Sequence, residues 1–182
     1  MNTTKTILSA TLLACAALTA PLVLAADISH PPQPLVLLDG TTDYGASFAA
    51  GNMGNTFADK FTFSTAGINF VDSLVSSISR TSVVGLDITG FALYDGSNTL
   101  VMNGTQLGSG SIDLWSLSAD NLAQGSYYVQ VSGTLVSATS GSFGANLNVT
   151  PVPEPETYGM MLAGLGVLGF LARRRNDGDR AA

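Results

Sequence analysis

Aspartate is the residue type through which this chain could do most chemistry. Residues 27–150 contain nine Asp, no Glu and only two basic residues, which gives this stretch a net charge near −7. Carboxylate oxygens can coordinate Ca²⁺, and two carboxylates with different pKa values can cleave a glycosidic bond. We expect no metal site, with Asp59, Asp87 and Asp95 as the candidates for Ca²⁺, because no EF-hand or calcium-binding repeat surrounds them. Alternatively, a strand begins near Lys60, and Asp59 accepts backbone N–H groups of the preceding turn.

Catalysis by a nucleophile would depend on His30, because the sequence contains no other histidine. His30 precedes Pro31 and Pro32 in a proline-rich stretch, residues 27–34, that predicts a loose N-terminal arm. We therefore expect a solvated imidazole instead of a Ser–His–Asp triad. Residues 104–110 are Gly-rich but lack the Lys of a phosphate-binding loop. The sequence predicts that the protein is not an enzyme and needs no cofactor, and its pI of about 4.3 disfavours nucleic acid as a partner.

Four aromatic side chains raise the question of sugar binding, because an exposed aromatic ring can stack on a sugar ring. Tyr127 and Tyr128 are adjacent in an alternating stretch, so they lie on opposite faces and one of them should be exposed or at an edge. For Trp115 and Tyr127 we expect packing in the core, and Tyr94 completes the set. A secreted carbohydrate-binding or Ca²⁺-binding module is therefore an alternative for the function.

The elements that would position these residues are short alternating stretches between turn residues, without long helical periodicity. This pattern predicts an all-β fold with a single β-sandwich of jelly-roll type over residues 27–150. Asp95-Gly96-Ser97-Asn98 predicts a hairpin turn. The expected strands are residues 60–63, 82–88, 90–94, 100–102, 112–117, 127–133, 135–136 and 143–149, and residues 70–78 favour a strand over a short amphipathic helix.

The N-terminus has the features of a secretory signal peptide over residues 1–26. Lys5 supplies the positive start, an almost uncharged apolar stretch follows, and the small residues Ala25 and Ala26 suit signal peptidase. The single cysteine, Cys15, lies inside this segment, so the mature chain would contain no cysteine. We therefore expect export to a compartment in which disulfides play no part in this protein.

The C-terminal segment, residues 151–182, predicts a temporary membrane anchor. Residues 150–156 are acidic and rich in proline, which indicates a stiff spacer. Residues 158–172 carry no charge and would form a transmembrane helix of about 22 Å, shorter than the roughly 30 Å hydrocarbon core. The positive cluster that follows would keep the C-terminus in the cytoplasm and the β domain outside, and it consists of Arg173, Arg174 and Arg175.

The order of these three parts resembles the PEP-CTERM sorting signal, in which a Pro-Glu-Pro motif, a Gly-rich apolar helix and an Arg cluster end the chain. Here the motif is Pro153, Glu154 and Pro155. The resemblance implies export across the inner membrane, recognition by exosortase and processing near this motif. It also implies a transient inner-membrane anchor, a final place at the cell surface or in the extracellular matrix, and association with exopolysaccharide or biofilm.

Two weaker resemblances concern the β domain. Phe57, Asp59 and Phe61 form the pattern F-x-D-x-F, which is similar to the pattern that names a subgroup of PEP-CTERM proteins. Residues 59–63, 86–88, 93–96 and 122–133 are similar, in the same order, to bacterial pre-peptidase C-terminal domains. These are small jelly-roll-like β-sandwiches that bind other molecules and do no catalysis. The resemblances together imply a structural or binding protein.

Overall fold

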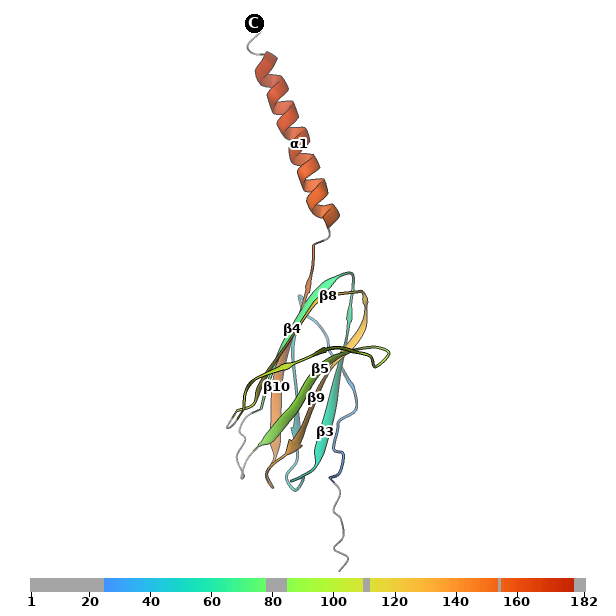
Figure 1. Ribbon diagram of the computed structural model, residues 1–182, viewed down its shortest axis with the longest axis vertical. Helices are drawn as coiled ribbons and strands as arrows, with labels where there is room; N and C mark the ends of the chain where they lie inside the picture. Colours follow the sequence, from blue (N-terminus) through green and yellow to red (C-terminus); the bar gives the residue numbers. More distant parts are fainter. Residues whose placement is uncertain (1–24, 78–84, 110–111, 154, 179–182) are drawn as a thin grey trace, which may run out of the picture.

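The strands of this chain form two five-stranded sheets that pack face to face, and one helix follows them (Figure 1). The computed structural model describes residues 25–77, 85–109, 112–153 and 155–178. In spatial order, the first sheet contains β1 (Gln33–Pro34), β3 (Thr56–Thr65), β9 (Gly125–Leu135), β5 (Leu86–Asp95) and β6 (Leu100–Asn103). The second contains β2 (Thr41–Phe48), β10 (Gly141–Pro151), β4 (Asn69–Ser77), β8 (Leu114–Leu122) and β7 (Thr105–Gly108). The predicted β-sandwich is confirmed.

The core lies between the inner faces of the two sheets, as period-two alternation requires. In β3 the inward row is aromatic, and Phe57, Phe61 and Phe63 are each less than 5% exposed. Val71 and Leu147 meet them from the second sheet and are completely buried. The core cluster and the side chains packed on it lie between Ile28 and Val149 and include no residue of the helix. The sandwich therefore holds its own core and does not depend on the C-terminal segment to bury it.

The observed strands confirm most of the predicted ones and join some of them. Predicted strands 82–88 and 90–94 fall in one strand, β5, which contains a bulge between Ile88 and Gly90, and residues 82–84 lie outside the described residues. Leu135 ends β9, so the separate strand at 135–136 was wrong. Residues 70–78 favoured a strand, and β4 is one. The sequence analysis missed β1, β2 and β7, which are short or poor in apolar residues.

The turn between β5 and β6 confirms the predicted hairpin. The Asp95 carboxylate accepts the backbone N–H groups of Ser97 at 2.9 Å and Thr99 at 2.8 Å, which closes the turn. The residue with positive φ is Asn98, at 64°, and not the glycine of the Asp-Gly pair. Asn is among the side chains that tolerate this conformation best.

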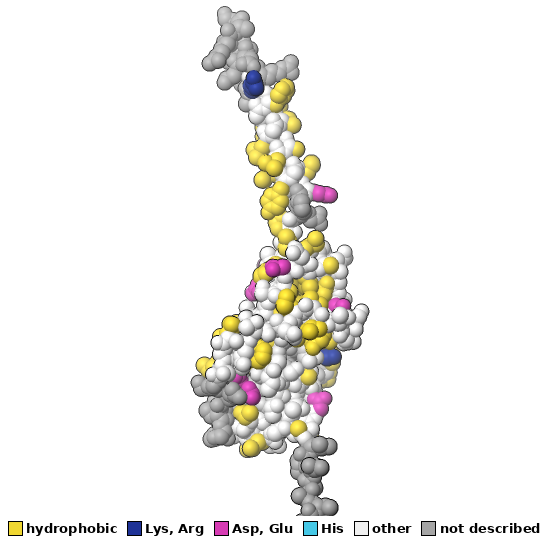
Figure 2. Space-filling view, in the orientation of Figure 1, with side chains coloured by type: hydrophobic (Ala, Val, Ile, Leu, Met, Phe, Trp, Pro, Cys, Tyr) yellow, Lys and Arg dark blue, Asp and Glu magenta, His cyan; other side chains and the backbone are white. Residues whose placement is uncertain are grey.

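The C-terminal helix, α1 (Pro155–Gly178), leaves one end of the sandwich and packs against no strand (Figure 1). Hydrophobic side chains lie along its exposed surface, whereas the backbone and side chains that are neither hydrophobic nor charged cover most of the sandwich in this view (Figure 2). Among the described residues, no helix has the combination of length and apolar character that would cross a membrane. The predicted spacer was wrong at its start, because Thr150 and Pro151 belong to β10. Only a three-residue connection separates β10 from α1.

A buried tyrosine makes the sandwich sensitive to alkaline pH. Tyr44 donates to the Ser73 hydroxyl at 2.8 Å, because that hydroxyl itself donates to the Asn146 carbonyl, and burial raises the pKa of Tyr44. Unfolded tyrosine ionises near pH 10 while folded Tyr44 keeps its proton. The contribution of Tyr44 to the free energy of unfolding is therefore fully present below pH 10 and falls as the pH rises further. We expect Tyr44→Phe to cost about 1 kcal/mol at pH 7 and to weaken the loss above pH 10. Urea unfolding at pH 7 and 11 measures both effects, and Tyr158→Phe on exposed α1 is the matched control that should change neither.

Candidate functional site

The N-terminal arm is part of the fold, which corrects the prediction that it is loose. The Ile28 N–H donates to the Thr56 carbonyl at 2.9 Å, and the Leu35 N–H donates to the Thr62 carbonyl at 2.8 Å. Between these two bonds β1 pairs in parallel with β3. Prolines are tolerated in this arm because it lies at the edge of the sheet, where missing N–H groups leave no gap in a ladder. The arm therefore covers the edge of β3.

The arm is fastened by a buried aspartate of β3. Asp59 is 1% exposed and lies on the inward face of the strand with Phe57 and Phe61. Its carboxylate accepts the backbone N–H of His30 at 2.7 Å and lies 2.9 Å from Nδ1 of the His30 ring. A buried carboxylate is costly unless it is hydrogen-bonded, and these two contacts meet that need. The expectation that the strand begins near Lys60 was wrong, because β3 begins at Thr56. The expectation of a solvated His30 imidazole was also wrong, because the ring is half-buried beside Asp59.

His30 and Asp59 have the geometry of two members of a catalytic triad, but they hold the arm in place. The His30 ring packs against Phe48, with 5.0 Å between ring centroids. Within the described residues, no hydroxyl hydrogen-bonds the remaining ring nitrogen, Nε2. In this part of the chain, the contacts of the pair are those that fasten the arm. What it supplies is a fixed position for residues 26–35.

The other two residues of the F-x-D-x-F pattern are core side chains. Phe61 contacts the rings of Tyr44 and Phe143, and Phe57 packs against Phe48. A Cβ atom at Gly133, opposite Phe57 in the ladder, would lie 2.6 Å from the Phe57 ring and 2.3 Å from a backbone oxygen. The pattern thus combines two core aromatics with the carboxylate that fastens the arm. Membership in the subgroup named for this pattern stays a prediction.

The three candidate Ca²⁺ ligands are not brought together. Asp59 points into the core, whereas Asp87 lies between the inward-facing Leu86 and Ile88 and so points outward. Asp95 ends the same strand eight residues later, about 26 Å from Asp87 at 3.3 Å per residue. In the part of the chain that the structure describes, no three His, Cys, Asp or Glu side chains gather into a group that could hold a metal ion.

The outer face of the first sheet carries an ordered aromatic pair. Tyr94 of β5 and Tyr128 of β9 lie directly opposite each other, and their rings stack with centroids 5.1 Å apart. The ammonium of Lys60 lies 4.9 Å from the Tyr128 ring centroid, and the Tyr128 hydroxyl donates to Asn98 at 3.0 Å. Burial by these neighbours, together with Tyr94 and Asp95, raises the pKa of Tyr128. Although Tyr128 faces outward it is only 7% exposed, so the expectation of an exposed or edge tyrosine was wrong for it.

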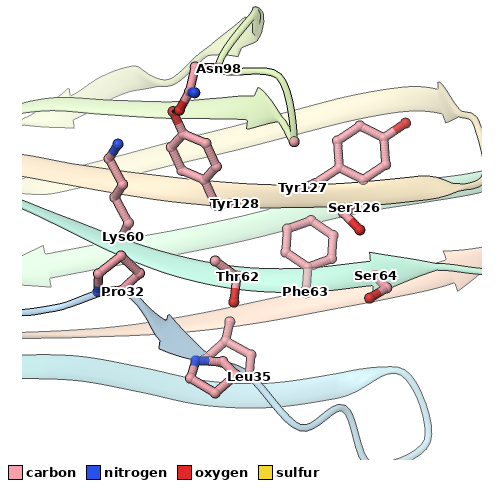
Figure 3. A pocket seen from close by; sticks show the side chains of 12 residues that line it. Pro32, Leu35, Lys60, Thr62, Phe63, Ser64, Asn98, Ser126, Tyr127 and Tyr128 are labelled. Atoms are coloured by element: carbon pink, nitrogen blue, oxygen red, sulfur yellow. The ribbon is translucent and has the colours of Figure 1, made fainter.

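A groove of about 420 Å³ lies beside this pair (Figure 3). Lys60, Tyr128 and Asn98 form one side, Pro32 and Leu35 of the N-terminal arm form the other, and β3 and β9 form the floor. Three aliphatic hydroxyl groups also line it, from Thr62, Ser64 and Ser126. The groove exists because the arm is fastened along β3, so His30 and Asp59 position one of its walls.

A second hollow of about 320 Å³ lies on the other side of the tyrosine pair. Tyr94, Gln130 and Asn103 line it together with Trp115, whose indole N–H donates to the Ile88 carbonyl at 3.2 Å. Trp115 and Tyr127 both pack against the core while keeping part of their surface exposed, which confirms their predicted core packing. Tyr128 lines the first hollow and Tyr94 lines the second, so the stacked pair contributes one ring to each.

The predicted sorting segment begins where the sandwich ends. The Val152 N–H donates to the Ile68 carbonyl at 2.9 Å and is the last hydrogen bond of the sandwich toward the helix. Pro153 is exposed, Glu154 lies outside the described residues, and Pro155 is the first residue of α1. Proline suits that position because its missing N–H would have no partner in the helix. The Arg cluster lies in the last turns of α1, where it comprises Arg173, Arg174 and Arg175.

Comparison with protein families finds the PEP-CTERM protein-sorting motif over residues 151–175. The match indicates that the protein is exported, is sorted by exosortase and is transiently anchored in the membrane through this C-terminal motif. The predicted signal peptide, residues 1–26, lies almost entirely outside the described residues and stays a prediction. No curated protein matches the sequence of the chain.

Comparison with solved structures finds chains that are similar to this one at low sequence identity. The pre-peptidase C-terminal domain of a collagenase from Bacillus anthracis is 19% identical, with a TM-score of 0.39, and covers 66% of this chain and 95% of its own. The periplasmic g-type lysozyme inhibitor PliG of Aeromonas hydrophila is 15% identical, with a TM-score of 0.44, and covers 69% and 100%. A Bacillus licheniformis lipase in its propeptide form is 11% identical, with a TM-score of 0.38, and covers 64% and 23%.

Proposed function

We propose that the protein is a non-catalytic binding or structural component of the cell surface or extracellular polymer matrix, delivered there by exosortase. The observation that carries this proposal is the sorting motif at residues 151–175, joined to a sandwich that holds its own core. A domain that folds without its tail keeps its structure when the tail is removed. The inner membrane, signal peptidase and exosortase are then its partners during export, and an exopolysaccharide or biofilm polymer is its partner afterwards.

Intact-mass analysis of the native protein tests the delivery step. In cells with exosortase we expect a mature chain that ends near the Pro-Glu-Pro motif, alone or linked to a new group. In cells without exosortase we expect the chain to extend to Ala182 and to remain with the membrane fraction. A chain that reaches Ala182 and stays in the membrane fraction in both strains would overturn the proposal.

A released carbohydrate-binding module is the second candidate, and the groove between the N-terminal arm and the tyrosine pair is the observation that favours it. The two candidates differ in where the processed domain acts. A processed chain in the culture medium supports release, and a processed chain that fractionates with the cell surface supports attachment.

A further inference from the structure

The groove beside Tyr128 differs in charge from the rest of the sandwich. Residues 27–150 contain nine Asp, yet none of the twelve residues that line the groove is acidic. Lys60 is the only lysine of that stretch, and it lies on the wall of the groove. Among the described residues, no carboxylate is within ion-pair distance of its ammonium. The ammonium lies over the Tyr128 ring, but no described carboxylate neutralises its charge, which leaves that charge to attract an anionic ligand.

The lining combines an apolar surface with hydroxyl and amide groups at its margin. Pro32, Leu35 and the tyrosine ring supply the apolar part, and Thr62, Ser126 and Asn98 supply donors and acceptors. Sites for sugars need this mixture, because a sugar ring presents C–H groups on its faces and hydroxyls around its edge. A peptide that added a strand would need a free sheet edge, and on this side β1 already pairs with β3. The lining therefore favours a glycan over a peptide.

We propose that this groove binds an acidic polysaccharide, with a uronate carboxylate on the Lys60 ammonium and the sugar ring against the apolar wall formed by Pro32 and Leu35. The neighbouring hollow contains Tyr94 and Gln130 of the first sheet and Trp115 of the second, and none of its lining residues is acidic. An extended chain crossing the sheet would occupy both hollows. This inference names the partner chemistry of the binding role proposed above and rests on that role.

The net negative charge of residues 27–150 repels an acidic polysaccharide. How strongly it does so depends on the distance between the carboxylates of the domain and those of the ligand. At physiological ionic strength, charges on exposed surface are screened beyond about 8 Å. The Lys60 ammonium would lie in direct contact with the uronate, whereas no acidic residue lines either hollow and Asp95, the nearby carboxylate that acts on Tyr128, is engaged by the backbone N–H groups of its own turn. The local attraction therefore exceeds the repulsion from the remaining surface.

Binding of purified protein to sodium polygalacturonate tests the proposal. The mature full-length chain is prepared from a strain without exosortase in an uncharged detergent, and calorimetry is carried out with polygalacturonate, dextran and polyglutamate. We expect saturable binding to polygalacturonate only. Lys60→Gln should weaken it about tenfold, as for loss of a charge-assisted hydrogen bond, while keeping the wild-type unfolding curve. Lys60→Arg should stay within about twofold of wild type, because it keeps the charge.

Arg80 supplies the matched control, because it is the only other basic residue of residues 27–150 and neither of the described residues that flank its segment, Ser77 and Gly85, lines the groove. Arg80→Gln changes the net charge as Lys60→Gln does and should leave the affinity within about twofold of wild type. Equal losses in the two variants, equal binding of polyglutamate, or no binding of polygalacturonate would each overturn the proposal. None of these results depends on exosortase, so failure here is distinguishable from failure of the delivery step.

Discussion

Replacing Asp59 by Ala should destabilise the sandwich by about 2–4 kcal/mol, the largest stability effect that we expect from a single polar residue of this chain. The carboxylate is 1% exposed and receives both polar contacts of His30, which fix the arm. The variant loses these contacts and leaves a space in the inward row of β3. It also frees the arm to leave the edge of β3. Urea unfolding at pH 7 measures the free energy, and amide hydrogen exchange measures the arm.

Asp43→Ala is the matched control, because Asp43 is an exposed residue of β2 and should change stability by less than about 0.5 kcal/mol. Asp59→Asn should lie between the two, since its oxygen can still accept the His30 backbone N–H. Hydrogen exchange should rise at residues 28–35 in both Asp59 variants and stay slow in the centre of β9. An Asp59→Ala protein as stable as the Asp43→Ala protein, or more stable than wild type, would show that the buried contacts are not stabilising.

The Asp59 carboxylate shows which part of this contact could be predicted from the sequence and which part could not. Strict alternation placed Asp59 on the face of Phe57 and Phe61, and a buried carboxylate needs a donor. The donor is His30, which is 29 residues earlier in the sequence. Prolines around His30 indicated a loose segment, because nothing local shows that a proline-rich segment will pair along the edge of a sheet. The one signal that could have located the contact was the need of a buried acid for a partner.

Strands with strong alternation could be predicted, and strands defined by their neighbours could not. β9 combines two aromatic and two valine side chains with clear alternation, and its position in the centre of a sheet follows that pattern. β2 contains only two large apolar side chains, Tyr44 and Phe48, and is a strand because β10 pairs with it along eight residues. The sandwich was thus predictable from its central strands, and its edges were not.

The groove could not be predicted for the same reason. Its walls come from the N-terminal arm, from β3 and β9, and from the turn after β5, which meet only through sheet order. Lys60 and Tyr128 are 68 positions apart in the sequence, and no spacing rule links them. By contrast, the sorting segment is local. Its motif, helix and Arg cluster follow one another along the chain, so sequence reasoning found all three.

Replacing Pro153, Glu154 and Pro155 together by Ala should abolish processing by exosortase while leaving the sandwich unchanged. The Val152 N–H donates to the Ile68 carbonyl and α1 begins at Pro155, so the motif lies where the sandwich ends and the helix begins. Each proline restricts its own φ and disfavours helical conformation in the residue before it, and we expect this restriction to keep the motif open to an enzyme. Alanine removes both restrictions and lets α1 extend toward the sandwich.

Intact mass and thermal unfolding measure the two halves of this prediction. We expect the triple variant to reach Ala182 in cells that contain exosortase, and to unfold within about 0.5 kcal/mol of wild type because no core residue lies beyond Val149. Glu156→Gln is the matched control, since it removes one acid next to the motif, in the first turn of α1, and should leave processing intact. A triple variant that is still processed would place recognition in the helix or the Arg cluster. A variant that unfolds much more easily would mean that the connection supports the sandwich, against the independence of the two parts.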